Sequence, residues 1–420
     1  MLLSHEDVAG LPGFESRLYL IEFPPGAASK PHIHSIPGLG YVIEGSFESS
    51  YDADAPTTTH AGESFVDVPN RVHHFRNPDP ARRLRFTLAG TFRKGEALFR
   101  LADSSQVRLQ TTASDRVTIA RPGLYPETVE LNPLTGKFLV GSIREGTVYE
   151  VGLDGTATKL IDDDRLTSIL GIAVDARTSR LLVTNSDLGA GLKRSARGPR
   201  KEAGVGIYDL ATGRPLHYVD LAPLLPDGEH LINGLTVDPE GNAYATDSFT
   251  PAIYKVDSNG VASVFLQDDE FKGAGVNLNG LVHHRKGYLL VVKKSTGALY
   301  RVPIADPRRF TRVAIEAKFI GGDGLILAAD KLLMVANQTP AAASNAAYVI
   351  ESEDDWVTAK VIESRDLGDV YPTSCVLLGR KVYALSSHLN EWIGAKPEAR
   401  EGIAKAGRQG ELREIGVLGD

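Results

Sequence analysis

Short apolar runs separated by Gly, Asp, Asn and Pro make up most of this chain. The runs are rich in Val, Leu, Ile and Tyr, and they are only about five to seven residues long. Runs of this length between turn-forming residues are typical of β-strands. A 3.6-residue apolar period, typical of helices, is scarce, and the best short helix candidate is residues 398–405. The pattern predicts an all-β fold.

A three-strand unit recurs after residue 115. Its first strand is apolar, its second follows a turn, and its third resembles TVYEV, AIYKV or ALYRV. Successive first strands are separated by 43, 63, 46, 44 and 50 residues. A repeat of about 40–50 residues with four strands per unit indicates a β-propeller. The six first strands begin at Glu127, Leu170, Asn233, Asn279, Asp323 and Thr373.

The predicted architecture is an N-terminal small β-barrel followed by a six-bladed β-propeller. Residues 1–104 form the barrel, the polar stretch 105–115 is a linker, and residues 116–420 form the propeller. The sixth unit lacks a clear third strand, and either 411–417 or 116–120 is expected to complete its sheet. A TIM barrel is excluded, because it would need about eight long helices between its strands.

Composition narrows the set of partners. The 420 residues carry a net charge of -7, which gives no reason to expect nucleic acid or an anionic membrane as partner. No apolar run approaches the roughly 18–20 residues of a membrane span. The single cysteine, Cys375, excludes an internal disulfide and fits a reducing compartment. A cytoplasmic protein acting on a small molecule is therefore expected.

Histidines are concentrated in the first 80 residues. In a strand, positions i and i+2 share a face, so His32 and His34 are expected to point the same way. A third imidazole at His74 would complete a three-nitrogen site suited to Zn, Fe, Ni or Mn. The neighbouring His73 is expected to point to the opposite face, at the surface.

These segments, GAASKPHIHSIPGLGYVIEG and GESFVDVPNRVHHFRN, resemble the two motifs of the cupin family of small β-barrels. The resemblance includes Gly26, Gly45, Pro69 and Asn77. The cupin pattern has a glutamate where this chain has Gly38, so either three histidines and water hold the metal or the site is empty. A barrel that serves only structure or homodimerisation is the alternative, since cupins often pair through their sheets.

The first residues of a propeller's inner strands surround its central axis. Here they include two carboxylates, Glu127 and Asp323, and two carboxamides, Asn233 and Asn279. Burying these groups without a partner is costly. Their oxygens suit Ca²⁺, Mg²⁺ or Mn²⁺, and Zn²⁺ is also compatible. Asn-Gly and Asp-Gly at strand starts can also be simple turn residues.

The motifs YPETVELNP, INGLTVDPEGNAYATDS, LNGLVHHRKGYLLVV and GGDGLILAADKLLMV resemble the gluconolactonase/senescence-marker-protein (regucalcin) family of six-bladed propellers. The resemblance spans roughly residues 115–420. It implies that Glu127, Asn279 and Asp323 hold a divalent metal, that Asn233 lies beside metal and substrate, and that Asp323 is the general base. The implied activity is metal-dependent hydrolysis of a lactone or related cyclic ester.

Two long insertions are candidates for substrate selection. The insertion in unit two carries Lys193, Arg194, Arg197, Arg200 and Lys201, and it is either a solvated loop or a lid that attracts an anionic substrate. The insertion in unit six, 388–407, contains Trp392. Lys293, Tyr371 and His388 are further candidates to reach the pocket.

Two other functions fit the same site. Related propellers include enzymes of natural-product assembly, so the pocket could support cyclisation or condensation without hydrolysis. The chain could also be a non-catalytic protein that binds a metal or a small molecule. A GxSxG motif is absent from the sequence, which disfavours an α/β-hydrolase mechanism.

Overall fold

The computed structural model describes residues 1–51, 56–69, 71–101, 115–328, 330–342, 345–379 and 381–417. The predicted linker at 105–115 lies outside these residues except for Asp115. Residues 1–114 belong to one compact unit, and the chain from Asp115 onward, apart from the turn 133–136, forms a second. No helix among the described residues is long and apolar enough to cross a membrane.

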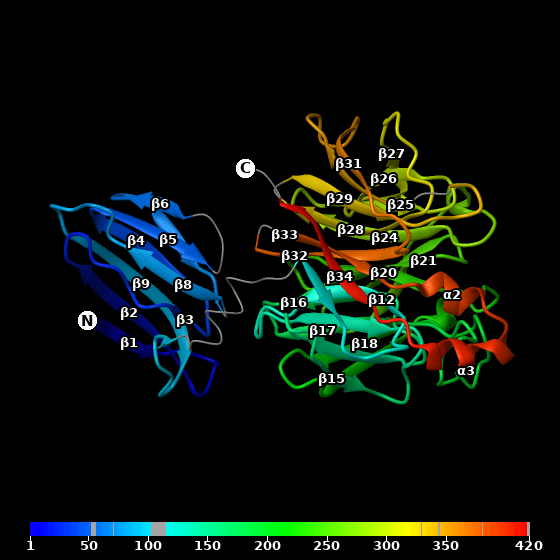
Figure 1. Ribbon diagram of the computed structural model, residues 1–420, viewed down its shortest axis with the longest axis horizontal. Helices are drawn as coiled ribbons and strands as arrows, with labels where there is room; N and C mark the ends of the chain where they lie inside the picture. The colour runs from blue at the N-terminus through cyan, green and yellow to red at the C-terminus, as the bar shows by residue number, and fades with distance from the viewer. Residues whose placement is uncertain are drawn as a thin grey trace. The chain divides into compact units, whose positions relative to one another are not determined.

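The N-terminal unit consists of two five-stranded antiparallel sheets (Figure 1). The first has the order β1 (Leu2–Asp7), β2 (Phe14–Phe23), β9 (Leu84–Arg93), β4 (Gly38–Glu44) and β7 (Ser64–Asp67). The second has the order β10 (Arg100–Leu101), β3 (His32–Ile33), β8 (Val72–Arg76), β5 (Ser46–Tyr51) and β6 (Thr57–His60).

The two sheets do not close into the predicted barrel. Each ends in edge strands that form no ladder with the other sheet among the described residues. Side-chain packing joins them instead, through a cluster from both sheets that contains Val42, Phe47, Phe75, Leu84 and Phe86. Three of these residues are phenylalanines, and aromatic side chains bury a large apolar area each, so the cluster can hold a small two-sheet unit together.

One face of the first sheet exposes apolar side chains. Leu39, Tyr41 and Ile43 on β4 and Val66 on β7 are all exposed, and Leu39 lies directly opposite Val66. Exposed apolar residues grouped in this way are typical of interaction surfaces. The homodimer through the cupin unit stays a prediction.

The second unit is a six-bladed propeller of four-stranded antiparallel sheets (Figure 1). Its inner strands β12, β16, β20, β24, β28 and β32 contact one another in sequence and close the ring. Blade one is β12 to β15 (Pro126–Leu131, Phe138–Ser142, Thr147–Val151, Ala157–Asp162), and blade two is β16 to β19 (Ile172–Asp175, Arg180–Asn185, Gly204–Asp209, Pro215–Asp220). Blade three is β20 to β23 (Ile232–Val237, Ala243–Asp247, Ala252–Val256, Ala262–Gln267), and blade four is β24 to β27 (Leu278–His284, Tyr288–Lys293, Ala298–Pro303, Thr311–Arg312). Blade five is β28 to β31 (Gly322–Ala328, Lys331–Ala336, Ala346–Glu351, Lys360–Asp366).

Both candidate segments complete the sixth blade. Its strands are β32 (Pro372–Leu378), β33 (Lys381–Ser386), β34 (Glu411–Val417) and β11 (Arg116–Thr118), the last contributed by the start of the unit. This pairing of the chain's two ends fixes the ring by backbone hydrogen bonds. The insertion of blade six contains α2 (Leu389–Gly394) and α3 (Pro397–Ala406). Helix α3 includes the helix predicted at 398–405. Short 3₁₀ helices span Ala222–Leu224, Asp269–Phe271 and Pro307–Arg309.

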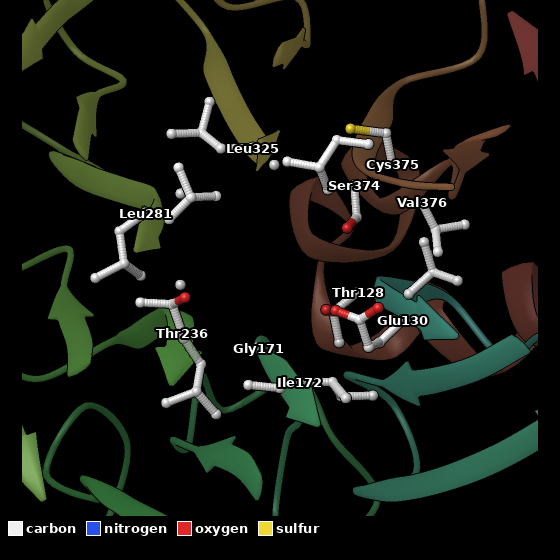
Figure 2. A pocket seen from close by; sticks show the side chains of 18 of the residues that line it. Thr128, Glu130, Gly171, Ile172, Thr236, Leu281, Leu325, Ser374, Cys375 and Val376 are labelled. Atoms are coloured by element: carbon white, nitrogen blue, oxygen red, sulfur yellow. The ribbon is translucent and has the colours of Figure 1, made fainter. Parts of the chain in front are cut away.

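The inner strands surround a cavity of about 450 Å³ that begins at the ring of first-strand residues. Figure 2 shows Leu281 and Leu325 on one wall and the oxygen atoms of Thr128 and Glu130 on another. Burial raises the pKa of Glu130 to about 7, although the Leu131 backbone N–H donates to this carboxylate. The cavity therefore contains a carboxyl group that titrates near neutral pH.

Glu130→Gln should remove a pH-dependent loss of stability. Folding raises the pKa of this carboxyl, so its ionisation destabilises the folded state. The destabilisation is absent below the ordinary pKa and grows to its full size as pH rises through about 7. The variant should gain up to about 3 kcal/mol over the wild type near pH 8 and about nothing near pH 4. Thermal unfolding at both pH values measures this. An equal difference at both would contradict it.

Candidate functional site

Four oxygen-bearing side chains meet where the inner strands begin. Glu127, Asn233, Asn279 and Asp323 come from four blades and are at most 5% exposed. Each lies at an irregularity in the pairing of its inner strand with the next strand. A β-bulge of this kind leaves a residue out of the ladder and redirects its side chain. The bulges therefore place these four residues, here called the oxygen ring, at the mouth of the cavity.

Glycines behind the ring allow the blades to approach. A Cβ on Gly234 would lie 2.5 Å from the Asn279 carbonyl oxygen, and one on Gly280 would lie 2.1 Å from that of Asp323. Gly171 meets the Asn233 carbonyl oxygen in the same way. No side chain fits at such distances, so these glycines serve contact between neighbouring blades. Close contact between blades, and not turn formation, therefore explains the glycines that follow Asn233 and Asn279.

Asp323 is paired with a buried lysine. Lys294 Nζ lies 2.6 Å from Asp323 Oδ2 and also donates to the Asn337 side-chain oxygen. The Asn337 amide donates to the same Asp323 oxygen. Lys294 follows the second strand of blade four, at the position that Ser248 occupies in blade three. That repeat comparison could have identified Lys294 from the sequence.

The sequence analysis named the neighbouring Lys293 as a candidate to reach the pocket. Lys293 Nζ donates instead to the backbone carbonyls of Glu270 and Lys272, both at 2.7 Å. Successive residues leave a strand in opposite directions, so only one of two adjacent lysines can reach the ring. Tyr371 lies near enough to Lys294 and Asp323 for their charges to act on its pKa, which burial raises.

The other ring oxygens have few protein partners. Asn233 Nδ2 donates to Ser248 Oγ at 3.1 Å. Among the described residues, neither the Glu127 carboxylate nor the Asn279 carboxamide makes a hydrogen bond. Burial and the neighbouring Asp323 charge raise the pKa of Glu127 well above its usual range, and Lys294 opposes this shift. Oxygens without a protein hydrogen bond, on buried residues that line a cavity, fit a hard divalent cation, which prefers carboxylate and amide oxygens.

An apolar cluster lies beside the ring, before the inner strands begin. Trp392 of α2 stacks on Tyr125, with ring centroids 4.9 Å apart, and its indole N–H donates to the Ala190 carbonyl. Leu170, Leu231 and partly buried Tyr371 join the same cluster. The insertions of blades two and six therefore meet here and cover the ring with apolar side chains.

The basic residues of the blade-two insertion are bound by the propeller itself. Lys193 pairs with Asp162 at 2.9 Å, and Arg197 pairs with Asp220 at 2.5 Å. Arg194 donates to the backbone carbonyl of Gly191, and none of these three cations lines the described cavity. Arg200 and Lys201 bind Glu229 and the Gly228 carbonyl. These contacts do not support the predicted role of Lys193, Arg194 and Arg197 in substrate binding.

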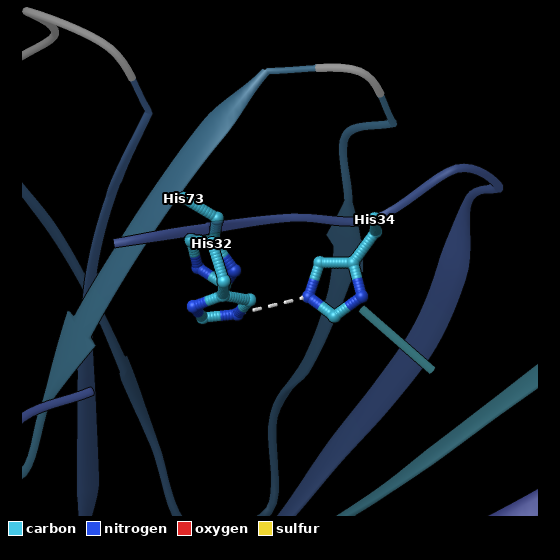
Figure 3. Close-up of side chains that lie close together, drawn as sticks. All are labelled: His32, His34 and His73. Carbon is cyan, nitrogen blue, oxygen red and sulfur yellow. Dashed lines mark hydrogen bonds between the residues drawn. The ribbon is translucent and has the colours of Figure 1, made fainter. Parts of the chain in front are cut away.

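In the N-terminal unit, three histidines come together, and the third is His73, not His74 (Figure 3). His32, His34 and His73 each offer a ring nitrogen, and these atoms lie within 4.8 Å of one another. The prediction of His74 was wrong because β3 pairs with β8 so that His32 lies directly opposite His73. Directly opposed residues share a face, which leaves His74 on the other face and half-buried.

Burial lowers the pKa of His32 to about 4 and that of His73 to about 2. Both imidazoles are therefore neutral at neutral pH, which is the form that binds a metal. Histidines can hold Zn, Fe, Ni or Mn, so this group is a second candidate metal site.

Comparison with known proteins supports both units at the level of fold. Residues 19–89 match the cupin domain model, which confirms the predicted cupin. A solved structure of unknown function from Bacteroides thetaiotaomicron is 11% identical, covers 99% of this chain and 97% of its own, and has a TM-score of 0.50. No curated protein matches this chain in sequence.

Two solved propellers with named functions match a smaller part of this chain. Regucalcin from Agrobacterium tumefaciens, a calcium-binding protein, is 17% identical, covers 73% of this chain and 94% of its own, and has a TM-score of 0.48. A gluconolactonase from Xanthomonas campestris is 12% identical, covers 71% and 89%, and has a TM-score of 0.47. Likenesses at this level carry no argument about activity, which must come from the site.

Lys294→Met should make the stability of the protein depend on a divalent cation. Removing one partner of a buried ion pair typically costs about 3–5 kcal/mol, because it leaves the other charge uncompensated. Added Ca²⁺ should restore much of this loss, whereas the wild type should gain less. Thermal unfolding with a chelator and with Ca²⁺ measures the effect. Lys272→Met, at an exposed ion pair, is the matched control; equal Ca²⁺ responses in Lys294→Met and wild type would refute the expectation.

Proposed function

We propose that this protein hydrolyses a lactone or related cyclic ester at the oxygen ring, with a divalent cation (Ca²⁺, Mg²⁺, Mn²⁺ or Zn²⁺) held by Glu127, Asn233, Asn279 and Asp323. The supporting observation is that these four buried side chains converge from four blades while Glu127 and Asn279 have no hydrogen-bond partner among the described residues. The motifs that resemble the gluconolactonase and regucalcin family contain the same four positions.

A bound divalent cation polarises an ester carbonyl and acidifies a coordinated water. Asp323 is the general base in this proposal. Lys294 and Asn337 both bind its Oδ2 atom, which fixes the carboxylate and leaves Oδ1 to accept a proton. Lys294 is a positioning residue, since it acts through Asp323.

The apolar cluster beside the ring favours a neutral lactone with an apolar substituent. Leu170, which belongs to this cluster and also lines the cavity, would contact such a substituent. The buried Tyr125, Trp392 and Leu231 would exclude bulk water, which strengthens electrostatic interactions at the ring. An anionic substrate gains less, because Lys193 and Arg197 are already paired with carboxylates.

Asp323→Asn should lower kcat/KM for the best substrate of a lactone panel by at least about 100-fold, the typical contribution of a general base. The panel should include alkyl- and aryl-substituted lactones together with a polar aldonolactone. Ring opening is followed by acid release, with and without a chelator. The substitution preserves side-chain size but leaves Lys294 without its counter-charge, so circular dichroism is recorded with each assay to establish that the variant is folded.

Asp269→Asn is the matched control, because that carboxylate lies on the exposed surface of the same unit. Its turnover should equal that of the wild type. Hydrolysis that persists in Asp323→Asn, or that a chelator does not affect, would sink the proposed mechanism. Turnover of the polar lactone alone would refute the preference for an apolar substituent.

A further inference from the structure

The hydrogen bonds of His32 and His34 fix which ring nitrogens carry protons. His32 Nδ1 lies 2.8 Å from the Lys30 carbonyl oxygen, and His34 Nδ1 lies 3.0 Å from that of Leu98. Carbonyl oxygens only accept, so both Nδ1 atoms must donate. In the neutral form of each ring Nε2 is then unprotonated, and the two Nε2 atoms lie 3.1 Å apart (Figure 3). Two facing lone pairs repel unless a cation lies between them.

His73 contributes a third nitrogen without a partner. Its Nε2 lies 2.9 Å from Ser49 Oγ, whereas its buried Nδ1 makes no hydrogen bond. The side chain is only 1% exposed, so water cannot readily satisfy this atom. Each of the three histidines thus has one nitrogen held by the protein and one directed into the cluster. Metal-binding histidines are typically held in this way.

Asp67, at the end of β7, adds a carboxylate to the cluster. Its Oδ2 lies 3.5 Å from His34 Nε2 and its Oδ1 lies 3.5 Å from His73 Nδ1. Tyr51 donates to Oδ1 at 2.8 Å and accepts from the Val68 N–H. Tyr51 therefore orients the carboxylate while Oδ2 stays available.

These separations match the edges of a metal coordination shell. With metal–ligand distances of about 2.0–2.2 Å, neighbouring ligand atoms lie roughly 2.9 Å apart in an octahedral site and roughly 3.4 Å apart in a tetrahedral one. The observed separations of 3.1 and 3.5 Å lie close to this range. Asp67 contacts His34 and His73 but is not in the group whose ligand atoms all lie within 4.8 Å of one another, so it must move toward His32 for all four side chains to bind one ion. The two 3.5 Å separations are longer than a good charge-assisted hydrogen bond, so a direct histidine–aspartate pair explains them less well.

The pairing of β4 with β7 explains why position 38 lacks a carboxylate. Gly38 lies directly opposite Asp67, so both positions share a face. A Cβ at Gly38 would approach the Asp67 Cβ to 3.4 Å and a Leu88 methyl to 2.7 Å. The glycine leaves the space beside the histidines to the side chain from the neighbouring strand.

We infer that Asp67 is the carboxylate ligand of a divalent transition-metal site in the N-terminal unit, completed by His32, His34 and His73. Three imidazoles and one carboxylate suit Zn, Fe, Ni, Mn or Co. This site is separate from the oxygen ring and does not depend on the function proposed for it.

Co²⁺ is the probe, since its visible absorption bands report the ligands. The full chain is stripped with a chelator and titrated with Co²⁺. The wild type should bind Co²⁺ with bands that His34→Gln abolishes, so any binding left in that variant belongs to other sites. Asp67→Asn should weaken the Kd of the His34-dependent site by at least about tenfold and shift its bands.

Two further variants complete the test. Asp7→Asn, at an exposed carboxylate of the same unit, should bind Co²⁺ as the wild type does. Tyr51→Phe keeps the Asp67 carboxylate and should weaken binding while the bands hold their position. It also tests the site if Asp67→Asn fails to fold, as circular dichroism of the metal-free protein would show.

Wild-type protein without His34-dependent bands would overturn the metal site. Asp67→Asn with an unchanged Kd and unchanged bands would overturn the role of Asp67. The bands in Tyr51→Phe should not shift as far as they would if a histidine ligand were lost, because Tyr51 acts only on the orientation of the carboxylate. A shift of that size would also contradict the role of Asp67.

Discussion

The close contact between neighbouring inner strands is the constraint on which the propeller site depends. Gly171, Gly234 and Gly280 each leave room for a backbone carbonyl of the next blade, at distances where no Cβ fits. Only with this contact can the bulged residues of several blades reach the same axis. Replacing any of these glycines would separate the blades at the ring, so the glycines determine the site although they carry no functional group.

Buried carboxylates are stabilised differently in the two units. At the propeller mouth, Lys294 compensates Asp323, while Glu127 is left with a raised pKa. In the cupin unit, the Asp67 carboxylate lies 3.5 Å from ring nitrogens of His34 and His73 and accepts a hydrogen bond from Tyr51. A buried carboxylate without a counter-charge is costly, so Asp323 is paired with a lysine of the protein, and a bound metal ion is proposed for Asp67.

Most of the architecture could be predicted because strands and repeats are local features of the sequence. The recurring unit indicated six blades, and Glu127, Asn233, Asn279 and Asp323 were found from their place in the repeat. Two of the departures were of one kind: His73, and not the predicted His74, joins the other histidines, and Lys294, and not its neighbour Lys293, reaches the ring. Adjacent residues on a strand point to opposite faces, and the pairing partner decides which of them faces the site.

The sequence by itself determined the all-β fold, the cupin domain and the four oxygen-bearing residues at the starts of inner strands, since apolar alternation, turn residues and repeat spacing specify these locally. Only the tertiary structure decided which cation pairs with Asp323, which histidine joins His32 and His34, and that Asp67 lies opposite Gly38. These contacts join residues far apart in the chain. They depend on strand register and on the approach of neighbouring strands, which no local pattern encodes.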